Sequence, residues 1–276
     1  MPEAKLKAVM FDMDDTLVDW SRRAQDWAEY ERQHLELVFN YISRDVHPLE
    51  TSDAFYRATT ELARRAWLDA ERGLRAPSLG KVMSQALVSL GVPADLIIIE
   101  KILTAYDWQP VSGVVAYPDA SEVLPILVGN NIKIGLVTNA YYPMWMRDRE
   151  LEAFGLLGHF ADCRLSSADV GFLKPHPSIF EAALQCLGAR PDEAVFIGDN
   201  PEADVAGAQG VGIRAVLRIG KRVPPMISGL IVPDGAINSL HELLPLLDEW
   251  YPTWRMNADT AKTGEVDGSA ASNPLS

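Results

Sequence analysis

The sequence predicts an α/β fold: a doubly wound, Rossmann-like parallel sheet with an inserted bundle of helices that forms a cap. Short apolar segments, typical of strands buried on both faces, alternate with amphipathic helical patterns along most of the chain. This alternation stops between residues 20 and 110, where only helical patterns occur. We therefore expect a core domain formed by residues 1–19 and 111–256, with residues 20–110 as a helical cap domain.

The expected strands are short apolar runs, and the first of them ends at an acidic cluster. They lie at residues 8–11, 132–138, 194–197, 213–217 and 230–232. Apolar residues recur at helical spacing between and after them, at residues 119–127, 143–154, 178–187 and 239–247. Strands that alternate with helices in this way predict a parallel sheet with helices on both of its faces.

The inserted segment contains four helical patterns, which are separated by proline and glycine residues. Their first apolar residues are Trp27, Phe55, Val82 and Leu96. About four helices are enough to form a small bundle of their own. By contrast, residues 257–276 contain almost no bulky apolar side chain, so we expect a disordered tail there.

The chain has 276 residues and a net charge of −13, from 25 Lys and Arg against 38 Asp and Glu. An acidic protein is repelled by nucleic acids and by anionic membranes, so we expect neither as a partner. No apolar stretch approaches the ~20 residues of a membrane span, and the N-terminus lacks the apolar core of a signal peptide. Two isolated cysteines, Cys163 and Cys186, fit reduced thiols, and we expect a cytoplasmic protein.

Four polar motifs follow predicted strands, and the first of them contains Asp12 and Asp14. The carboxyl ends of the strands form the ligand-binding edge of an open parallel sheet, so motifs far apart in sequence can meet there. Taken alone, these two residues could also form an exposed acidic turn or cap a helix. A calcium-binding loop is excluded, because its sixth and twelfth positions hold Leu17 and Arg23 instead of Gly and Glu.

The second and third motifs supply a hydroxyl and an ammonium group. Thr138 and Asn139 stand at the end of the strand predicted at residues 132–138, where the hydroxyl could donate to an anionic oxygen. Lys174 lies in the segment FLKPHP, and its ammonium can neutralise a phosphate. Each residue has an ordinary alternative, since a Thr at a strand end often caps a turn and most lysines are simply solvated.

The fourth motif, GDNPEAD, follows the strand at residues 194–197 and contains Asp199 and Asp204. Pro201 suits the first turn of a helix, which would bring Asp204 back to the edge at which Asp199 lies. The alternative is an acidic helix start that faces the helix dipole. Together the four motifs predict a cluster of carboxylates with one hydroxyl and one ammonium, which suits Mg²⁺ and a phosphate group.

These motifs resemble the signatures of the haloacid dehalogenase-like hydrolase superfamily, in the branch with a helical cap inserted after the first motif. The four signatures stand here as FDMDDTL, LVTN, FLKPHP and GDNPEAD. The resemblance extends from about Ala8 to Leu217. Asp15 stands where a Gly is often found, an exchange that the family tolerates.

The resemblance implies a catalytic or metal-binding role for each of Asp12, Asp14 and Asp199. Asp12 would be the nucleophile that forms an aspartyl phosphate, and Asp14 would protonate the leaving oxygen and then activate water. The carboxylates of Asp12 and Asp199 and the backbone carbonyl of Asp14 would hold Mg²⁺. Members that cleave carbon–halogen bonds lack the second Asp, so Asp14 disfavours dehalogenation.

The resemblance also implies how the substrate is held. Thr138, Asn139 and Lys174 would bind the phosphoryl group, and Asp204 would orient Lys174 or ligate the metal through a water molecule. We therefore expect a Mg²⁺-dependent phosphatase that acts on a small phosphorylated metabolite. A phosphomutase of the same fold and a non-catalytic phosphometabolite-binding protein are the alternatives.

The cap would set the choice of substrate, since it closes over the site. Tyr141 and Tyr142 follow the second motif and could line the pocket. Other basic and aromatic residues are candidates too, although solvent exposure or packing within the bundle is the expected role of each: Trp20, Arg22, Arg23, Trp27, Arg64 and Arg65. The cap contains only two lysines, Lys81 and Lys101, which disfavours the phosphonate cleavage that relatives perform with a cap lysine.

Overall fold

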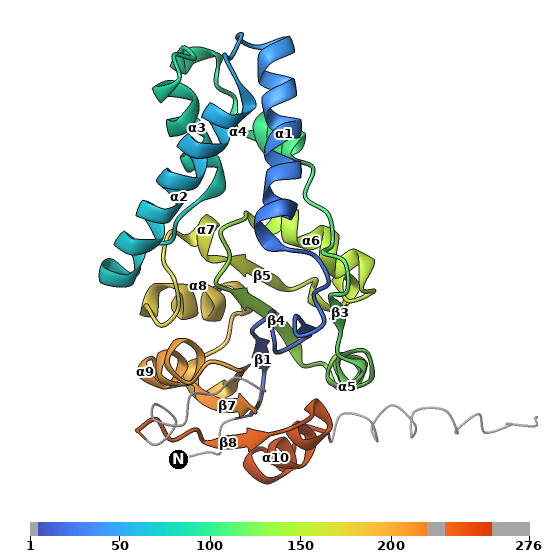
Figure 1. The fold of residues 1–276 in the computed structure, drawn as a ribbon. Coiled ribbons are helices and arrows are strands. Elements are labelled where there is room, and N and C mark those ends of the chain that lie inside the picture. Colours follow the sequence, from blue (N-terminus) through green and yellow to red (C-terminus); the bar gives the residue numbers. More distant parts are fainter. Residues whose placement is uncertain (1–4, 220–229, 256–276) are drawn as a thin grey trace, which may run out of the picture.

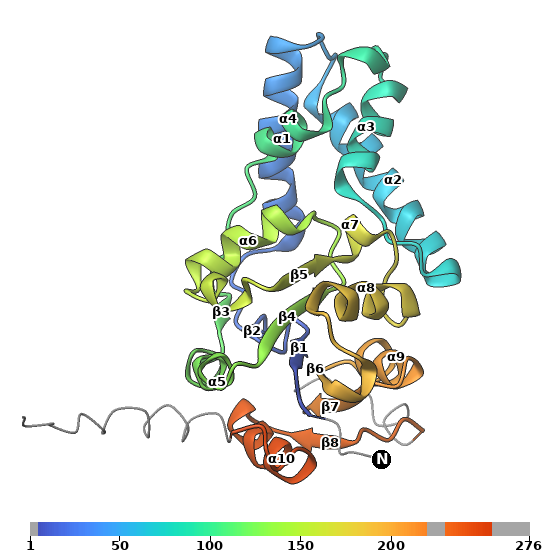
Figure 2. The ribbon, with the colours of Figure 1, turned by 180° about the vertical axis from the view of Figure 1, so that it is seen from behind.

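A computed structural model describes residues 5–219 and 230–255 of the chain. A six-stranded sheet with helices on both sides forms one part, and four helices stand beyond one end of its strands (Figure 1; Figure 2). The predicted fold class is therefore confirmed. No helix in the described part of the chain is long and apolar enough to cross a membrane.

All six strands of the sheet run parallel, in the order β5–β4–β1–β6–β7–β8. Their bounds are Ala8–Phe11 (β1), Lys133–Thr138 (β4), Cys163–Ser166 (β5), Ala194–Gly198 (β6), Arg214–Arg218 (β7) and Gly235–Ile237 (β8). From β1 the chain builds outward to β4 and β5, and then returns to place β6 on the other side of β1. The carboxyl ends of β1, β4 and β6 therefore lie side by side at the switch point, where open α/β sheets bind ligands.

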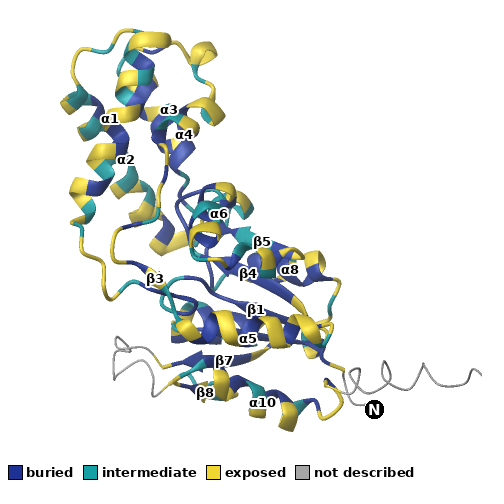
Figure 3. Ribbon diagram, turned by 90° about the vertical axis from the view of Figure 1, so that its right-hand side faces the viewer, coloured by how far each residue is buried: buried dark blue, intermediate teal, exposed yellow. Residues whose placement is uncertain are grey.

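Helices cover both faces of the sheet, because successive residues of a strand point to opposite faces. In β1, Val9 and Phe11 pack into one core, and Ala8 and Met10 pack into the other. The helices that cover the sheet are α5 (Pro118–Gly129), α6 (Met144–Ala153) and α10 (Leu243–Trp250) on the first core, with α8 (Pro177–Leu187) and α9 (Gly207–Gly210) on the second. Figure 3 shows the buried strands between helices whose outer surfaces are exposed.

A small antiparallel pair, β2 (Val18–Asp19) and β3 (Val115–Ala116), joins the sheet to the helical insert. Between these two strands lie α1 (Trp27–Asp45), α2 (Ser52–Gly73), α3 (Leu79–Ser89) and α4 (Ile99–Tyr106). The four helices stand over the carboxyl edge of the sheet, where the polar motifs lie (Figure 1). The division into domains at residues 19/20 and 110/111 stays a prediction, which the β2–β3 pair supports by bringing both connections together.

The strand predicted at residues 230–232 is wrong. Leu230 and Val232 are 88% and 75% exposed, and the edge strand β8 begins only at Gly235, where its pairing with β7 starts. The strand β5, in which Arg164 forms an ion pair with Asp148, was not among the predicted strands. Both errors concern edge strands, which lack the continuous apolar pattern of the buried central strands. The predicted tail at residues 257–276 lies outside the described residues.

Candidate active site

Seven side chains that the sequence singled out line one small cavity of about 200 Å³ at the carboxyl edge of the sheet. They are Asp12, Asp14, Thr138, Asn139, Lys174, Asp199 and Asp204. Asp12 follows β1, Thr138 ends β4 and Asp199 follows β6, so three neighbouring strands position the cavity. The structure thus brings together residues that are up to 192 positions apart, 204 minus 12, in the sequence.

Lys174 is the cation at the centre of this cavity. Its Nζ lies 2.6 Å from Asp12 Oδ1 and 2.7 Å from Asp204 Oδ1, and all three side chains are buried. Burial alone would lower the pKa of Lys174, but the carboxylates of Asp12 and Asp204 outweigh it and raise that pKa above its usual value. The ammonium therefore stays charged where an anionic group would enter.

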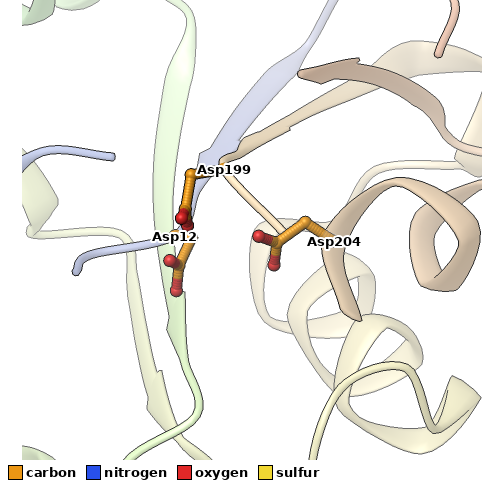
Figure 4. Close-up of side chains that lie close together, drawn as sticks. All are labelled: Asp12, Asp199 and Asp204. Atoms are coloured by element: carbon orange, nitrogen blue, oxygen red, sulfur yellow. The ribbon is translucent and has the colours of Figure 1, made fainter. Parts of the chain in front are cut away.

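Asp12, Asp199 and Asp204 form an acidic cluster, with one carboxylate oxygen of each within 4.8 Å of the others (Figure 4). Burial raises the pKa of Asp12 well above its usual value; Lys174 opposes this shift, whereas Asp204 and Asp199 add to it. Burial, together with the nearby Asp204 carboxylate, raises the pKa of Asp199 to about 7. Three carboxylates share one ammonium, so a divalent cation would relieve their repulsion. Carboxylate oxygens are the ligands that Mg²⁺ prefers, and this cluster fits it.

Thr138 and Asn139 occupy the end of β4 and differ in what they contact. The Thr138 Oγ1 atom is buried and has no hydrogen-bond partner among the described residues, so it can serve an incoming oxygen atom. The amide of Asn139 instead clamps the backbone of Lys174. Its Oδ1 accepts from the Lys174 N–H at 2.7 Å, and its Nδ2 donates to the Lys174 carbonyl at 3.0 Å. This clamp is what the structure shows for Asn139, and direct phosphate binding by it stays a prediction.

A tight turn after β6 aims Asp204 at Lys174. The segment Pro201–Ala206 winds as a π-helix that leads into α9, and the Asn200 N–H donates to Asp204 Oδ2 at 2.9 Å. Gly198 makes this return possible, because a Cβ atom there would lie 2.2 Å from the carboxyl carbon of Asp204. Of the two roles considered for Asp204, contact with Lys174 is the one that the geometry provides directly.

Asp14 points to the rim of the cavity, and two donors hold the same oxygen of its carboxylate. The indole Nε1 of Trp20 donates to Asp14 Oδ1 at 2.6 Å, and Nη2 of Arg147 donates to it at 2.5 Å. The other oxygen, Oδ2, is therefore the atom at which a proton could be carried. Trp20, which was expected to pack within the bundle, thus contacts a candidate site residue.

Sequence analysis missed Arg147 and Glu150, which lie beneath Asp14 on α6. Both side chains are buried, and Arg147 Nε lies 3.0 Å from Glu150 Oε2. Burial raises the pKa of Glu150 to about 7, although Arg147 opposes this shift. The only available signal was an acid–base pair at i and i+3. The α6 sequence, MWMRDRELEA, holds several other charges, so nothing distinguished this pair from solvated neighbours.

Asp15 adopts a left-handed backbone conformation, with φ of 56°. This region favours Gly, and among the other residues it is Asn and Asp that enter it most readily. An Asp can therefore stand in the turn after Asp14, where the backbone conformation would otherwise favour Gly.

A second cavity of about 680 Å³ adjoins the first and lies between the helical insert and the sheet edge. Its lining residues are Asp14, Asp15, Trp20, Ser21, Arg23, Trp27, Glu31, Ala63, Trp67, Asn139, Ala140, Tyr141, Tyr142 and Arg147. The two tyrosines therefore line the pocket, as the sequence suggested. Arg64 and Arg65 instead pair with Glu61 on the exposed surface of α2.

The model of one protein family matches residues 6–212, and its description reads haloacid dehalogenase-like hydrolase. Curated relatives include a glyceraldehyde 3-phosphate phosphatase of Methanopyrus kandleri, 28% identical over 88% of this chain and 98% of the relative. A phosphoglycolate phosphatase of Salmonella typhimurium is also 28% identical, over 88% of this chain and 92% of its own. A phosphoserine phosphatase of Thermus thermophilus is 40% identical, but over only 36% of this chain and 39% of its own.

Solved structures of the same family share the fold. A HAD phosphatase from Thermococcus onnurineus is 26% identical, with a TM-score of 0.53 over 88% of this chain and 98% of its own. A 2-haloacid dehalogenase from Pseudomonas syringae is 26% identical, with a TM-score of 0.56 over 89% of this chain and 99% of its own. The motifs at the sheet edge, the helical insert and these similarities agree, and the chain belongs to the haloacid dehalogenase-like hydrolases.

Proposed function

We propose that this protein is a cytosolic, Mg²⁺-dependent phosphatase that hydrolyses a small phosphorylated metabolite through an aspartyl phosphate on Asp12. One observation carries this proposal: the buried Asp12 carboxylate lies 2.6 Å from the Lys174 ammonium and shares its cavity with the Thr138 hydroxyl, which has no hydrogen-bond partner within residues 5–219 and 230–255. A nucleophile, a cation and a hydrogen-bond donor thus converge on a volume in which a phosphoryl group can sit. The named phosphatases among the relatives support the same reaction class.

In the first step, a carboxylate oxygen of Asp12 attacks phosphorus, and the bond from phosphorus to the alcohol oxygen breaks. Asp14 gives its Oδ2 proton to the leaving oxygen, so that an alcohol departs. Lys174 and Thr138 bind the phosphoryl oxygens, which carry the developing charge. A halide needs no proton when it leaves, so the presence of Asp14 favours phosphate esters over carbon–halogen substrates.

In the second step, water attacks the phosphorus of the aspartyl phosphate. Asp14 takes the proton from this water at Oδ2, the bond from phosphorus to Asp12 breaks, and inorganic phosphate and the Asp12 carboxylate are regenerated. The residues that would hold Mg²⁺ are Asp12 and Asp199, through their carboxylates, and Asp14, through its backbone carbonyl. When bound there, the ion would supply positive charge that offsets the repulsion between the Asp12 carboxylate and an anionic phosphate.

The test is phosphate release from a panel of phosphorylated metabolites, with Mg²⁺ and with EDTA. We expect metal-dependent release that disappears in Asp12→Asn. Asp95→Asn is the matched control, because Asp95 is an exposed residue of the insert that lines neither cavity. Undiminished turnover in Asp12→Asn would refute the mechanism, and an isomerised product without free phosphate would indicate a mutase instead.

A further inference from the structure

The cavity of about 680 Å³ beside the phosphate site is walled by aromatic rings. From these rings we infer that the leaving group of the substrate carries a planar heteroaromatic ring with hydrogen-bonding groups. The five aromatic residues that line the cavity are Trp20, Trp27, Trp67, Tyr141 and Tyr142. The inference rests on the proposed phosphatase function and names the class of alcohol that the enzyme releases.

The two cavities are placed for the two ends of one phosphate ester. They share Asp14, Asp15 and Asn139 in their linings, so a phosphoryl group beside Lys174 would direct its alcohol into the larger space. Glyceraldehyde 3-phosphate and phosphoglycolate, the compounds that name two relatives, are short aliphatic esters. A space of about 680 Å³ exceeds what such alcohols fill, and its size is in the range of typical ligand pockets.

The rings come from both sides of the cavity and are held in place by further aromatic contacts. Trp27 lies on α1 and Trp67 on α2, whereas Tyr141 and Tyr142 follow β4. Trp67 on the insert contacts Tyr141 at the sheet edge, with ring centroids 6.3 Å apart and ring planes inclined by 46°. Trp108, which is not among the lining residues, packs against Tyr142 with ring centroids 4.0 Å apart. Aromatic faces fixed in this way favour a flat ligand that can stack on them.

The aromatic residues of this cavity are not all buried, as they would be in a hydrophobic core. Tyr141 and Tyr142 are buried, but Trp67 remains 39% exposed at the cavity wall. A large aromatic side chain gains stability when its surface is removed from water, and a stacked ligand ring would cover this exposed face.

Polar groups in the same lining indicate that the ring carries heteroatoms. The Tyr141 hydroxyl is buried and has no hydrogen-bond partner among the described residues. The carboxylate of Glu31 on α1 also lines the cavity, where it can accept from a ring N–H or an amino group. Arg23 lies at the start of the insert and also lines the cavity. Its guanidinium carbon Cζ is 5.8 Å from the ring centroid of Trp27, so the guanidinium adds a hydrogen-bond donor.

Matched pairs of esters test the inference. Adenosine 5′-monophosphate and ribose 5-phosphate share the same reacting ester and differ in the base, and benzyl and cyclohexylmethyl phosphate differ only in the aromaticity of the ring. Stacking of a base on an aromatic side chain is worth roughly a 5- to 150-fold change in affinity. We expect kcat/KM to be at least about tenfold higher for the aromatic member of each pair.

Variants locate the preference in the cavity. Trp67→Ala should lower kcat/KM for adenosine 5′-monophosphate about fivefold or more and leave that for ribose 5-phosphate within about twofold. Leu68→Ala is the control, because Leu68 is the exposed neighbour of Trp67 on α2 and does not line the cavity. Glu31→Ala should weaken turnover of the nucleotide without affecting that of benzyl phosphate, which has no hydrogen-bond donor on its ring.

A binding measurement keeps this inference separate from the proposed function. Calorimetry on Asp12→Asn with Mg²⁺ compares the affinity of adenosine 5′-monophosphate with that of ribose 5-phosphate in the absence of turnover. At least about tenfold tighter binding of the nucleotide, lost in the double variant with Trp67→Ala, supports the ring site even if no ester is hydrolysed. Equal kcat/KM within both pairs of esters, together with equal affinity for the nucleotide and ribose 5-phosphate, would overturn the inference, whereas the phosphatase function would stand on phosphate release alone.

Discussion

Replacing Arg147 by Met tests whether the buried Arg147 guanidinium, which pairs with Glu150, also positions Asp14. The Arg147 guanidinium contacts Asp14 Oδ1 at 2.5 Å and Glu150 Oε2 at 3.0 Å, and its side chain is only 3% exposed. Methionine keeps much of the length and apolar volume and removes the charge. Asp14 would then keep the bond from Trp20 Nε1 and lose the second donor that fixes its orientation.

Arg147→Met should have two separate effects, one on the reaction rate and one on stability. An error of about 1 Å in the position of a catalytic group can reduce a rate roughly 10²-fold, so we expect Arg147→Met to lower kcat/KM about 10- to 100-fold. Breaking a buried ion pair costs about 3–5 kcal/mol when the remaining charge stays unpaired. The pKa of Glu150 is already raised to about 7 by burial, so its carboxyl can take up a proton at pH 6. The loss of stability should therefore be smaller at pH 6 than at pH 8.

Steady-state kinetics and urea unfolding at both pH values measure the two effects. The double variant Arg147→Met with Glu150→Leu removes the unpaired carboxylate as well, and we expect it to regain much of the stability but not the rate. If the double variant recovered both stability and wild-type kcat/KM, Arg147 would be a purely structural residue and the positioning argument would be wrong.

Three further predictions follow from the same contacts. Asp14→Asn should lower kcat by roughly 10²–10⁴, the contribution of general acid–base catalysis, and an unchanged kcat would exclude Asp14 as the proton donor. Lys174→Met should lower kcat/KM by roughly 10²–10³, as expected for the loss of one group that stabilises the transferring phosphoryl oxygens, whereas the exposed Lys81→Met should have no effect. The pKa of Glu150 is raised by burial from 4.5 to about 7, so the native state holds a proton that the unfolded chain has released, and this residue makes stability fall as the pH rises from about 4.5 to 7. Urea unfolding across this range should show wild type losing up to about 3 kcal/mol relative to Glu150→Gln, and parallel curves would contradict the assignment.

The central strands of the sheet could be predicted, because strands that are buried on both faces have nearly continuous apolar sequences. The runs that became β1, β4, β6 and β7 are buried along almost their whole length. The edge strands β5 and β8 are partly exposed, with only two buried residues in β5 and one in β8. Local sequence cannot distinguish such segments from loops, because tertiary pairing determines them.

In the site, too, residues next to buried strands could be predicted, whereas residues that only tertiary packing brings there could not. Asp12, Thr138 and Asp199 could be placed from sequence, because each directly follows or ends a recognisable strand. Arg147 and Glu150 contact the site from the middle of a charged helix, and only the packing of α6 shows which of its charged side chains point inward.

Phosphorylation of Asp12 during turnover is the most direct test of the proposed mechanism. The protein is quenched in acid during steady-state hydrolysis, and the peptide that contains Asp12 is examined by mass spectrometry. Borohydride reduction of a parallel sample converts an acyl phosphate at this position to homoserine. We expect one added phosphoryl group on Asp12 in wild type and none in Asp12→Asn. Phosphate release at the wild-type rate with Asp12 unmodified throughout would contradict it, because water would then attack the substrate directly.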